Sequence, residues 1–507
     1  MKTTAIIMMV ITIVSKVMGL LRESVKAYFY GTGNIATAFV MAQTIPVFIF
    51  NFIQMGITTG YIPSYNRILK KDGKEAAHKF TSNLGNVAVV IAIILVIIIE
   101  IFAGPIVKLF APGFDAETFN LTVQFTRITS ISIIASALAC VYKSYLNARN
   151  NFIIPNLQGF VMNTFIILAL AVSFYTQQPI LLAVGLCFAI AIQYVIYIPA
   201  VKASRFKYTK GIDFKDSNLR EMLILALPVI FGVAIYQINI LIDKSLSSLI
   251  LQNGPTILDY ATRLNDFVNG IVIVSIGTVV YPQLSKQSAN HDIKSFKDTI
   301  LSSLSMISVL VIPAMVGLII FSSPIVKLVF ERGQFTAEDT LITSQCLQLY
   351  AIGLIGVAVR DIISKSFYAM KDTKTPTKNS VLMVIVNVGA SIIFSYILGI
   401  RGLALGTAIA SIFGAIVLTL KLRKKIGTFN NVRKTLVEIF KMIISSVVMG
   451  LGSYFVFTLL SSTLSSSLSL LISILVAVII YAIMVLVLKV EEIRLLIMGI
   501  KNKIPKN

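Results

Sequence analysis

The chain is poor in the residues that perform catalysis and hold metals. Its 507 residues include 3 cysteines, 2 histidines and no tryptophan. Cys140, Cys187 and Cys346 are scattered through apolar runs without metal-site spacing, so we expect no disulfide framework and no cysteine metal centre. His78 and His291 lie in basic segments, away from any cysteine or serine that could act with them. Because no glycine-rich nucleotide-binding pattern follows a strand, we expect neither an enzyme nor an ATP-driven transporter.

Charged residues are also scarce, at 13% of the chain against 56% hydrophobic residues, and the mean hydropathy is +0.87. A soluble domain averages about 25% charged residues. Apolar runs long enough to cross about 30 Å of hydrocarbon recur from end to end. The first run, residues 4–21, lacks a small-residue cleavage site and precedes further runs, so we interpret it as a retained helix. The composition predicts an all-α polytopic membrane protein.

The apolar runs predict fourteen transmembrane helices. They cover residues 4–21, 36–62, 84–109, 121–146, 158–175, 180–201, 219–245, 260–283, 300–322, 341–364, 379–398, 402–420, 437–459 and 466–488. Most of the 44 lysines and arginines fall at the termini and in alternate loops, which is typical of helices oriented by basic cytoplasmic loops. This alternation places both termini on the cytoplasmic side. It also explains the net charge of +22 without a nucleic-acid partner.

Two halves of the chain repeat a sequence pattern. Residues 101–109 (IFAGPIVKL) recur as residues 320–328 (IFSSPIVKL), with the two prolines 219 positions apart. Further matches at this or nearly this offset are Pro63 with Pro282, and Lys143-Ser-Tyr145 with Lys365-Ser-Phe367. Each match falls at the same stage of a unit of six helices. An even number of spans per unit predicts parallel repeats about an axis along the membrane normal.

The repeat divides the chain into three predicted parts: an N-terminal lobe at 1–210, a C-terminal lobe at 211–425, and two extra C-terminal helices with a tail at 426–507. Two six-helix lobes around a central cavity suit alternating access. A membrane scaffold that transports nothing would not require this arrangement, although nothing in the sequence forbids it.

Charges cluster in the first span, where an ionisable group at the bilayer centre costs roughly 2.5–3.5 kcal/mol. Ser15, Arg22, Glu23 and Lys26 share one helical face, with Lys16 at its flank. One interpretation is an interfacial patch that contains an Arg22–Glu23 pair. The other is a cationic lining for an anionic headgroup, because arginine can donate two parallel hydrogen bonds to a phosphate.

The eighth span carries a second charged face, formed by Asp259, Arg263 and Asp266 at i, i+4 and i+7. The alternatives are a self-neutralising triad within one helix and part of a polar cavity. In the tenth span we favour a structural interpretation, a neutralised pair of Arg360 and Asp361.

A cation site is a further prediction. Asp243 either pairs with its neighbour Lys244 or acts as a cation ligand. Asn387, Ser391 and Thr407 are neutral oxygen donors in the eleventh and twelfth spans, and hard cations such as Na⁺ bind oxygen.

Several segments, in chain order, resemble the MurJ (MviN) family of lipid II flippases, within the multidrug/oligosaccharidyl-lipid/polysaccharide (MOP) exporter superfamily. They are SKVMGLLRE at 15–23, ATAFVMA at 36–42 followed by Pro46, Gly56 and Pro63, YATRLNDFVNG at 260–270, Phe335-Thr336, and Phe367-Tyr368 with Asp372 and Thr375-Pro376. The resemblance implies translocation of undecaprenyl-diphosphate-linked lipid II across the bacterial cytoplasmic membrane for cell-wall synthesis. It implies no cofactor other than a coupling ion.

The resemblance also assigns roles to residues. Arg22 and Arg263 would be the essential cavity arginines, with Ser15 and Glu23 beside the first. Asp243, Asn387 and Thr407 would hold sodium, with Ser391 where other members have an acid. Members alternate between inward- and outward-open states, driven by membrane potential or a cation. The expected partners are lipid II, membrane lipid and the cell-wall synthesis machinery, and we expect a monomer.

The chain departs from the family pattern at three places. Lys16 stands where the family usually has a second arginine, and Thr37 where an acid is common. Phe50 and Asn51 replace an arginine pair. A related polyprenyl-linked glycan is therefore an alternative substrate. A multidrug cation antiporter would be expected to carry intramembrane acids in its first lobe, where this chain has Arg22 and Lys16.

Overall fold

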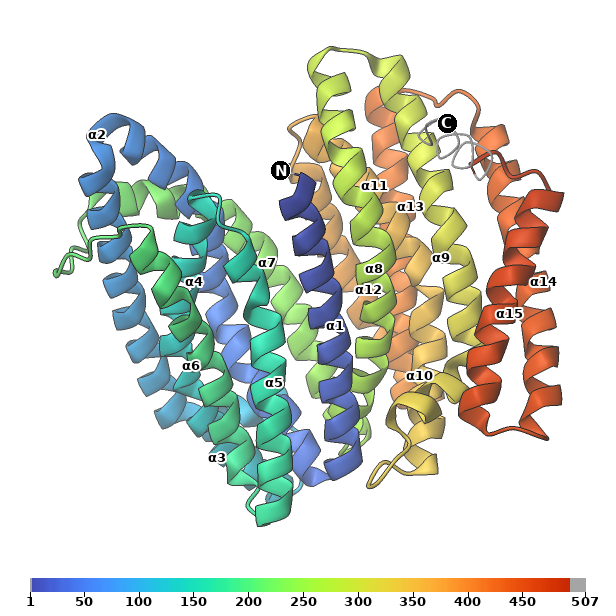
Figure 1. The fold of residues 1–507 in the computed structure, drawn as a ribbon, viewed down its shortest axis with the longest axis horizontal. Helices are drawn as coiled ribbons and strands as arrows, with labels where there is room; N and C mark the ends of the chain where they lie inside the picture. The colour runs from blue at the N-terminus through green and yellow to red at the C-terminus, as the bar shows by residue number, and fades with distance from the viewer. Residues whose placement is uncertain (1, 493–507) are drawn as a thin grey trace. The chain divides into compact units, whose positions relative to one another are not determined.

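The computed structural model describes residues 2–492, apart from the side chains of residues 2–6, 9, 228, 231 and 271–279. These residues form fifteen α-helices and no β-strand (Figure 1). The helices are α1 (Lys2–Tyr30), α2 (Asn34–Phe110), α3 (Ala116–Ser130), α4 (Ser132–Ala148), α5 (Ile153–Thr176), α6 (Ile180–Ala203), α7 (Ser217–Ile250), α8 (Gly254–Ala289), α9 (Ile293–Phe330), α10 (Ala337–Ile352), α11 (Leu354–Ala369), α12 (Lys374–Leu398), α13 (Ile400–Ile426), α14 (Val432–Ser461) and α15 (Ser466–Val487).

The predicted spans all lie in helical structure, although helix and span do not correspond one to one. The predicted spans at 121–146 and 341–364 are each interrupted by one non-helical residue, Ile131 and Gly353. In contrast, α2 is 77 residues long and contains two predicted spans. Its connecting segment, predicted as a loop, is helical on both sides of Gly73, whose φ is 84° and ψ −176°.

The part of the chain that the structure describes contains eleven helical segments long and apolar enough to cross a membrane. Their outer faces carry large exposed apolar side chains, such as Phe455 (64% exposed) on α14 and Leu475 (65% exposed) on α15. Such a continuous apolar surface would be a liability in water but is suited to hydrocarbon. The chain is therefore a multi-pass integral membrane protein.

Proline bends α2 and α9 at equivalent positions. Phe102 has φ −104° and ψ 18°, and Phe321 has φ −100° and ψ 16°, so both depart from helical values. Each lies three residues before a proline, Pro105 or Pro324. A proline within a helix removes one backbone hydrogen bond and clashes with the carbonyl four residues earlier, which accounts for both bends.

The helices form two compact units, each with its own interior. Unit 1 contains the chain up to Ile257 together with Arg332–Thr336, and unit 2 contains Leu258–Glu331 and the chain from Ala337 onward. Helix α7 packs on α2 and belongs to unit 1, whereas the predicted lobe boundary at 210 assigns it to the second lobe. The predicted boundaries concern the sequence repeat, and they stay a prediction.

Buried aromatic residues fill one end of unit 1. Tyr61 and Tyr65 on α2 are stacked with their ring centroids 5.6 Å apart, and the ring of Tyr145 on α4 meets Tyr65 edge-on. The Tyr61 hydroxyl lies 2.6 Å from the hydroxyl of Thr81, so its polar atom is satisfied in the core. Phe50, at one of the departures noted above, is 5% exposed and belongs to this core.

A long irregular segment after α6 is held against α2 by polar contacts. The backbone N–H of Lys207 donates to Nδ1 of His78 (3.2 Å), and that of Asp213 donates to Oδ1 of Asn83 (2.8 Å). Burial lowers the pKa of His78, and the nearby Lys74 lowers it further. The imidazole therefore stays neutral near pH 7 and keeps the lone pair that accepts this hydrogen bond.

In unit 2, α12 and α13 pack closely along a stripe of small residues on α13. Gly402, Gly406, Ala410 and Gly414 recur every four residues, and a Cβ added at Gly406 would overlap Ser391 on α12. Small residues allow helix backbones to approach closely in a membrane. This packing buries Ser391 completely.

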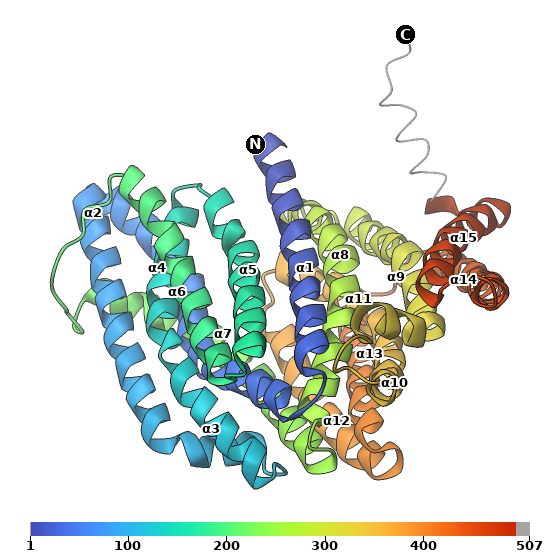
Figure 2. The same cartoon turned by 60° about the horizontal axis from the view of Figure 1, so that its bottom comes forward.

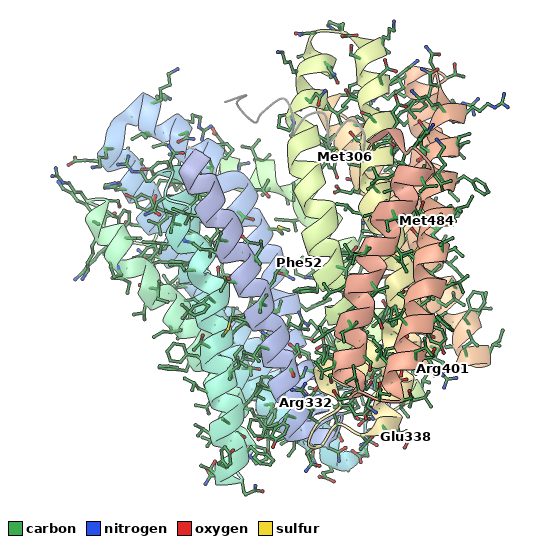
Figure 3. The ribbon with its side chains drawn as sticks, turned by 45° about the vertical axis from the view of Figure 1, so that its right-hand side comes forward. Phe52, Met306, Arg332, Glu338, Arg401 and Met484 are labelled. Carbon is green, nitrogen blue, oxygen red and sulfur yellow. The ribbon has the colours of Figure 1, made fainter. Side chains whose placement is uncertain are left out.

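The last two helices pair with each other and rest on α9 (Figure 1). The Tyr481 hydroxyl on α15 donates to the carbonyl of Val309 on α9 at 2.8 Å. Within unit 2, Glu338 and Arg401, which the topology predicts near the outer side, lie at the end away from Met306 (Figure 3).

Candidate functional site

Helices α1 and α5 of unit 1 lie side by side and pack through small residues (Figures 1 and 2). A Cβ added at Gly19 would lie 3.5 Å from Nδ2 of Asn163, and one added at Gly159 would lie 3.2 Å from Cβ of Ser15. Nδ2 of Asn163 also donates to the carbonyl of Ser15 at 3.2 Å. The close packing brings a polar side chain of α5 against the charged face of α1.

An ionic cluster lies on this face of α1. Nε of Arg22 donates to Oε1 of Glu23 at 3.0 Å, and a second guanidinium nitrogen bonds the same oxygen. Nη1 of Arg22 donates to Oδ1 of Asn163 at 3.0 Å. Nζ of Lys26 lies 2.5 Å from Oε2 of Glu23. The carboxylate is thus held between two cations.

The cluster is shielded from solvent, since Arg22 is 7% exposed, Glu23 2% and Lys26 3%. Removing charges from water costs several kcal/mol per ion unless hydrogen bonds and an opposite charge compensate. The network supplies both for Arg22. Two cations, Arg22 and Lys26, thus face one carboxylate, and either cation can donate hydrogen bonds to an anion such as a phosphate.

The other two predicted residues of α1 flank this cluster. Ser15 contributes its backbone carbonyl to Asn163, and its side chain packs on Gly159. Lys16 is partly buried, and none of the ion pairs found among the described residues involves it. The structure therefore brings Ser15 and Arg22 to Asn163, and Arg22 connects Glu23 to this group.

In unit 2, the predicted charges of α8 lie near a polar cavity. Nη2 of Arg263 lies 3.5 Å from Oδ1 of Asp259, one helical turn earlier. The Arg263 side chain is 43% exposed and that of Asp259 15% exposed. Asp266 is exposed and lines the cavity.

The cavity has a volume of about 670 Å³ and is enclosed by α8, α11 and α12. Its lining is mostly polar or charged. The lining residues are Asp266, Asn269, Gly270, Tyr281, Val357, Arg360, Asp361, Ser364, Lys365, Tyr368, Pro376, Asn379 and Ser380. Its four ionisable acids and bases, two of each sign, have no net formal charge. Such a lining suits a polar ligand that is rich in hydroxyl and amide groups.

The ion pair predicted in the tenth span has a different partner. Nζ of Lys365 lies 2.5 Å from Oδ2 of Asp361, one turn away on α11. Nη1 of Arg360 instead approaches Sδ of Met383 at 3.2 Å. Residues four apart are neighbours on the surface of a helix, which allows the pair of Asp361 and Lys365.

The four predicted cation ligands fall in both units. Asp243 is on α7 of unit 1, where its Oδ2 accepts from Nδ2 of Asn239 at 3.2 Å. Asn387 and Ser391 are buried together on α12, with Oγ of Ser391 donating to Oδ1 of Asn387 at 3.3 Å. Thr407 on α13 donates to a carbonyl of its own helix, that of Leu403. The structure thus brings Asn387 and Ser391 together, and a sodium site that includes the others stays a prediction.

Sequence reasoning missed Asn163 and most of the cavity lining. Asn163 could have been found, because it is an amide inside the apolar run at 158–175, and polar residues inside spans are costly. Lys365 was noted only as a marker of the repeat. Its role in the cavity depends on packing between three helices, which periodicity does not reveal.

The chain matches the model of the family described as lipid II flippase MurJ over residues 26–488. It is 29% identical over 412 residues to a probable lipid II flippase MurJ of Rickettsia prowazekii, which covers 80% of this chain and 81% of that protein. It is 26% identical over 459 residues to a probable lipid II flippase MurJ of Vibrio cholerae, covering 88% and 87% of the two chains.

Solved structures show the same fold. A lipid II flippase MurJ in an inward closed conformation matches with a TM-score of 0.82 and 29% identity, over 94% of this chain and 98% of that chain. A multidrug resistance transporter of the MATE family, in an inward-facing conformation, matches with a TM-score of 0.69 and 16% identity over 83% of this chain. The second likeness concerns the fold alone.

Proposed function

The chain belongs to the lipid II flippase MurJ family, and from this premise we propose that it carries lipid II across the bacterial cytoplasmic membrane. Lipid II is a polyprenyl diphosphate that bears a glycan needed for cell-wall synthesis. The observation that carries the proposal is the buried cluster of Arg22, Glu23 and Lys26, in which two cations pair with one carboxylate. A diphosphate is the anionic part of this substrate.

The cluster would bind the diphosphate by exchange of anions. Arg22 donates from two nitrogens to one oxygen of Glu23, and the same two N–H groups can instead donate in parallel to two oxygens of a phosphate. A diphosphate that approaches Arg22 and Lys26 replaces the carboxylate, and Glu23 takes the cations back when the substrate leaves. Asn163 is a positioning residue, because it holds the third nitrogen of Arg22 in place during the exchange.

The cavity of unit 2 would hold the sugar part of the substrate. Its lining combines Asn269, Ser364, Asn379 and Ser380 with charges of both signs, and Arg263 lies one turn from Asp266 on α8. Hydroxyl and amide groups match such donors and acceptors. The formal neutrality of the cavity favours a sugar there and the diphosphate at Arg22.

The proposal includes the fourteen spans, both termini in the cytoplasm, and two parallel six-helix repeats followed by two extra helices. The equal bends at Phe102 and Phe321, 219 residues apart, support the repeat. The alternating basic loops support the orientation. Two repeats around a cavity would open alternately to each side of the membrane.

Turnover would be coupled to membrane potential or to Na⁺. Asp243, Asn387, Ser391 and Thr407 are the proposed ligands. If sodium binds them, replacing Na⁺ by choline at constant potential lowers transport, and Asp243→Asn abolishes that dependence. Equal transport in both salts would leave the potential as the driving force.

A related polyprenyl-linked glycan is the second candidate substrate, favoured by one observation. Phe50, where the family usually has an arginine, is a core residue 5% exposed and contributes nothing to a polar lining. The site of this chain therefore has fewer cations than the family pattern implies.

Complementation tests the function. The wild-type chain is expected to support growth of a bacterial strain depleted of its own lipid II flippase, and Arg22→Ala and Arg263→Ala are expected to fail at equal abundance in the membrane. Arg127→Ala is the matched control, because Arg127 is a half-exposed arginine whose guanidinium lies 3.9 Å from Glu100. Failure of the wild type would remove lipid II as the substrate. Rescue by both alanine variants would remove the proposed binding site.

A further inference from the structure

Two turns of the chain dock on helix ends, each through a backbone N–H that donates a hydrogen bond. In the turn between α2 and α3, the N–H of Gly113 donates to Oγ of Ser248 near the end of α7 at 3.3 Å. In the turn between α9 and α10, the N–H of Gln334 donates to the carbonyl of Tyr28 near the end of α1 at 3.0 Å. All of these residues belong to unit 1.

The two contacts are related by the sequence repeat. Gly113 and Gly333 are 220 residues apart, and so are Tyr28 and Ser248. The turn of the first repeat therefore rests on the first helix of the second repeat, and the reverse holds for the other turn. Reciprocal contacts of this kind define an isologous interface about a twofold axis.

A third contact marks the position of that axis. Oγ1 of Thr256 donates to Oγ1 of Thr37 at 2.9 Å, and these two residues are 219 positions apart. Residues that are equivalent in two repeats touch each other only next to the axis that relates them. Thr37 is 1% exposed and Thr256 is fully buried, so this junction is closed.

Glycine makes both dockings possible. A Cβ added at Gly113 would overlap the carbonyl oxygen of Ser248, and one added at Gly333 would overlap the carbonyl oxygen of Tyr28. Gly333 also has φ +60°, a region that residues with a side chain rarely adopt. At both places a glycine lies so close to a backbone carbonyl oxygen that one added methyl group is incompatible with the contact.

We propose that the two turns are a matched pair of latches that hold the outer ends of the two repeats together. Both latches must release before a lipid-linked substrate can leave on that side, a statement that rests on the proposed function. The latching itself does not depend on which substrate is carried. Packed interfaces of this kind switch between discrete arrangements, so loss of either latch shifts the population toward the open one.

Disulfide trapping at the axis tests the proposal without any substrate. Thr37→Cys and Thr256→Cys are introduced into the full chain after Cys140, Cys187 and Cys346 have been replaced by serine. The rate of oxidative cross-linking is then measured in purified protein, alone and with Gly113→Ala or Gly333→Ala. Gly317→Ala is the control, because a Cβ added there meets nothing within 4 Å.

Each latch variant is expected to slow cross-linking by about threefold or more, and to a similar extent, whereas Gly317→Ala leaves the rate unchanged. Unchanged rates in both latch variants would overturn the proposal, and an effect of one alone would overturn the matched pair. Should a glycine variant fail to accumulate, Ser248→Ala decides, since it removes the hydrogen bond of Gly113 without adding an atom. It is expected to slow cross-linking less than Gly113→Ala does, and an unchanged rate would count against the latch.

Complementation by the same variants separates this proposal from the proposed function. If the latch variants slow cross-linking but the wild-type chain does not rescue a strain depleted of its lipid II flippase, the latch proposal stands and lipid II is excluded as the substrate. Rescue by the wild type with unaltered cross-linking in both latch variants would support lipid II as the substrate and overturn the latches.

Discussion

The two polar regions among the spans hold charge in opposite ways. In unit 1, Arg22 and Glu23 are almost completely buried, and Arg22 is bonded to both Glu23 and Asn163. In unit 2, the paired side chains of Asp361 and Lys365 are 31% and 22% exposed and line an open cavity. A buried network is preorganised but intolerant of the loss of any member, whereas a solvated lining can adapt. In unit 1, therefore, a substitution that weakens substrate binding should also lower the stability of the protein. In unit 2 the two effects can occur separately.

Arg22→Ala should have the largest effect. It leaves Glu23 with one cation in a buried site, and breaking a buried ion pair costs about 3–5 kcal/mol. We expect a clear fall in the melting temperature of the purified protein, together with loss of complementation. Arg22→Lys keeps the charge but loses the fork, so it should restore most of the stability and little of the activity. Equal activity of the lysine variant and the wild type would show that the paired N–H groups of arginine are not required.

Asn163→Asp should separate charge from structure. The new carboxylate still accepts from Arg22, but it adds a negative charge beside the cations and cannot donate to the carbonyl of Ser15. We therefore expect a moderate fall in the melting temperature and activity at least about tenfold lower, because the added carboxylate competes with the diphosphate for Arg22. Asn163→Ala, the matched control, should lower both. Full activity of the aspartate variant would show that the positive charges of Arg22 and Lys26 are not needed for transport.

Lys365→Ala should affect recognition in unit 2 with little loss of stability. The pair with Asp361 is partly exposed, and exposed pairs contribute about 1 kcal/mol or less. We expect several-fold lower transport with a nearly unchanged melting temperature. A fall in stability as large as that of Arg22→Ala would abolish the contrast between the two regions.

Replacing Asp372 should have the smallest effect on stability, and it provides a reference value for an exposed ion pair. Burial raises the pKa of Asp372, but hydrogen bonds from Lys425 and Thr375 outweigh it and hold the pKa at about 2, below its ordinary 3.8. A carboxylate with a lowered folded pKa contributes stability above its unfolded pKa and loses it as the pH falls through the folded pKa. Because the Lys425 side chain is 42% exposed, the contribution is about 1 kcal/mol or less.

The difference in stability between the wild type and Asp372→Asn should therefore be constant near neutral pH and vanish between about pH 4 and pH 2. Thermal unfolding across this range measures it. A difference that persisted at pH 2 would show that the effect of Asp372 is not electrostatic.

Much of the fold follows from the sequence. Every predicted span lies in helical structure, because backbone N–H and C=O groups in lipid must be hydrogen-bonded and a helix satisfies them within one segment. What the runs cannot show is where a helix continues past the membrane. The segment around Gly73 is helical because its lysines and alanines favour helix, although no apolar pattern marks it.

The candidate site was only half accessible from the sequence. Spacing on one helix was enough to place Arg22, Glu23 and Lys26 on a common face. Asn163 joins them from 141 residues away, and such a partner depends on the packing of α1 on α5. Likewise, Asp361 pairs with Lys365 while Arg360 approaches Met383 on α12, and the sequence alone does not decide between the adjacent cation and the one four residues later.

The central claim is that the diphosphate of the substrate exchanges with Glu23 on Arg22. Equilibrium binding of lipid II to the purified chain in lipid nanodiscs tests it most directly, with the wild type, Arg22→Ala and Glu23→Gln measured side by side. The claim predicts about ten- to hundredfold weaker binding for Arg22→Ala, from the loss of charge-assisted hydrogen bonds. It predicts binding at least as tight as the wild type for Glu23→Gln, because the competing carboxylate is gone. Wild-type affinity in Arg22→Ala, or a loss of affinity in folded Glu23→Gln, would contradict it.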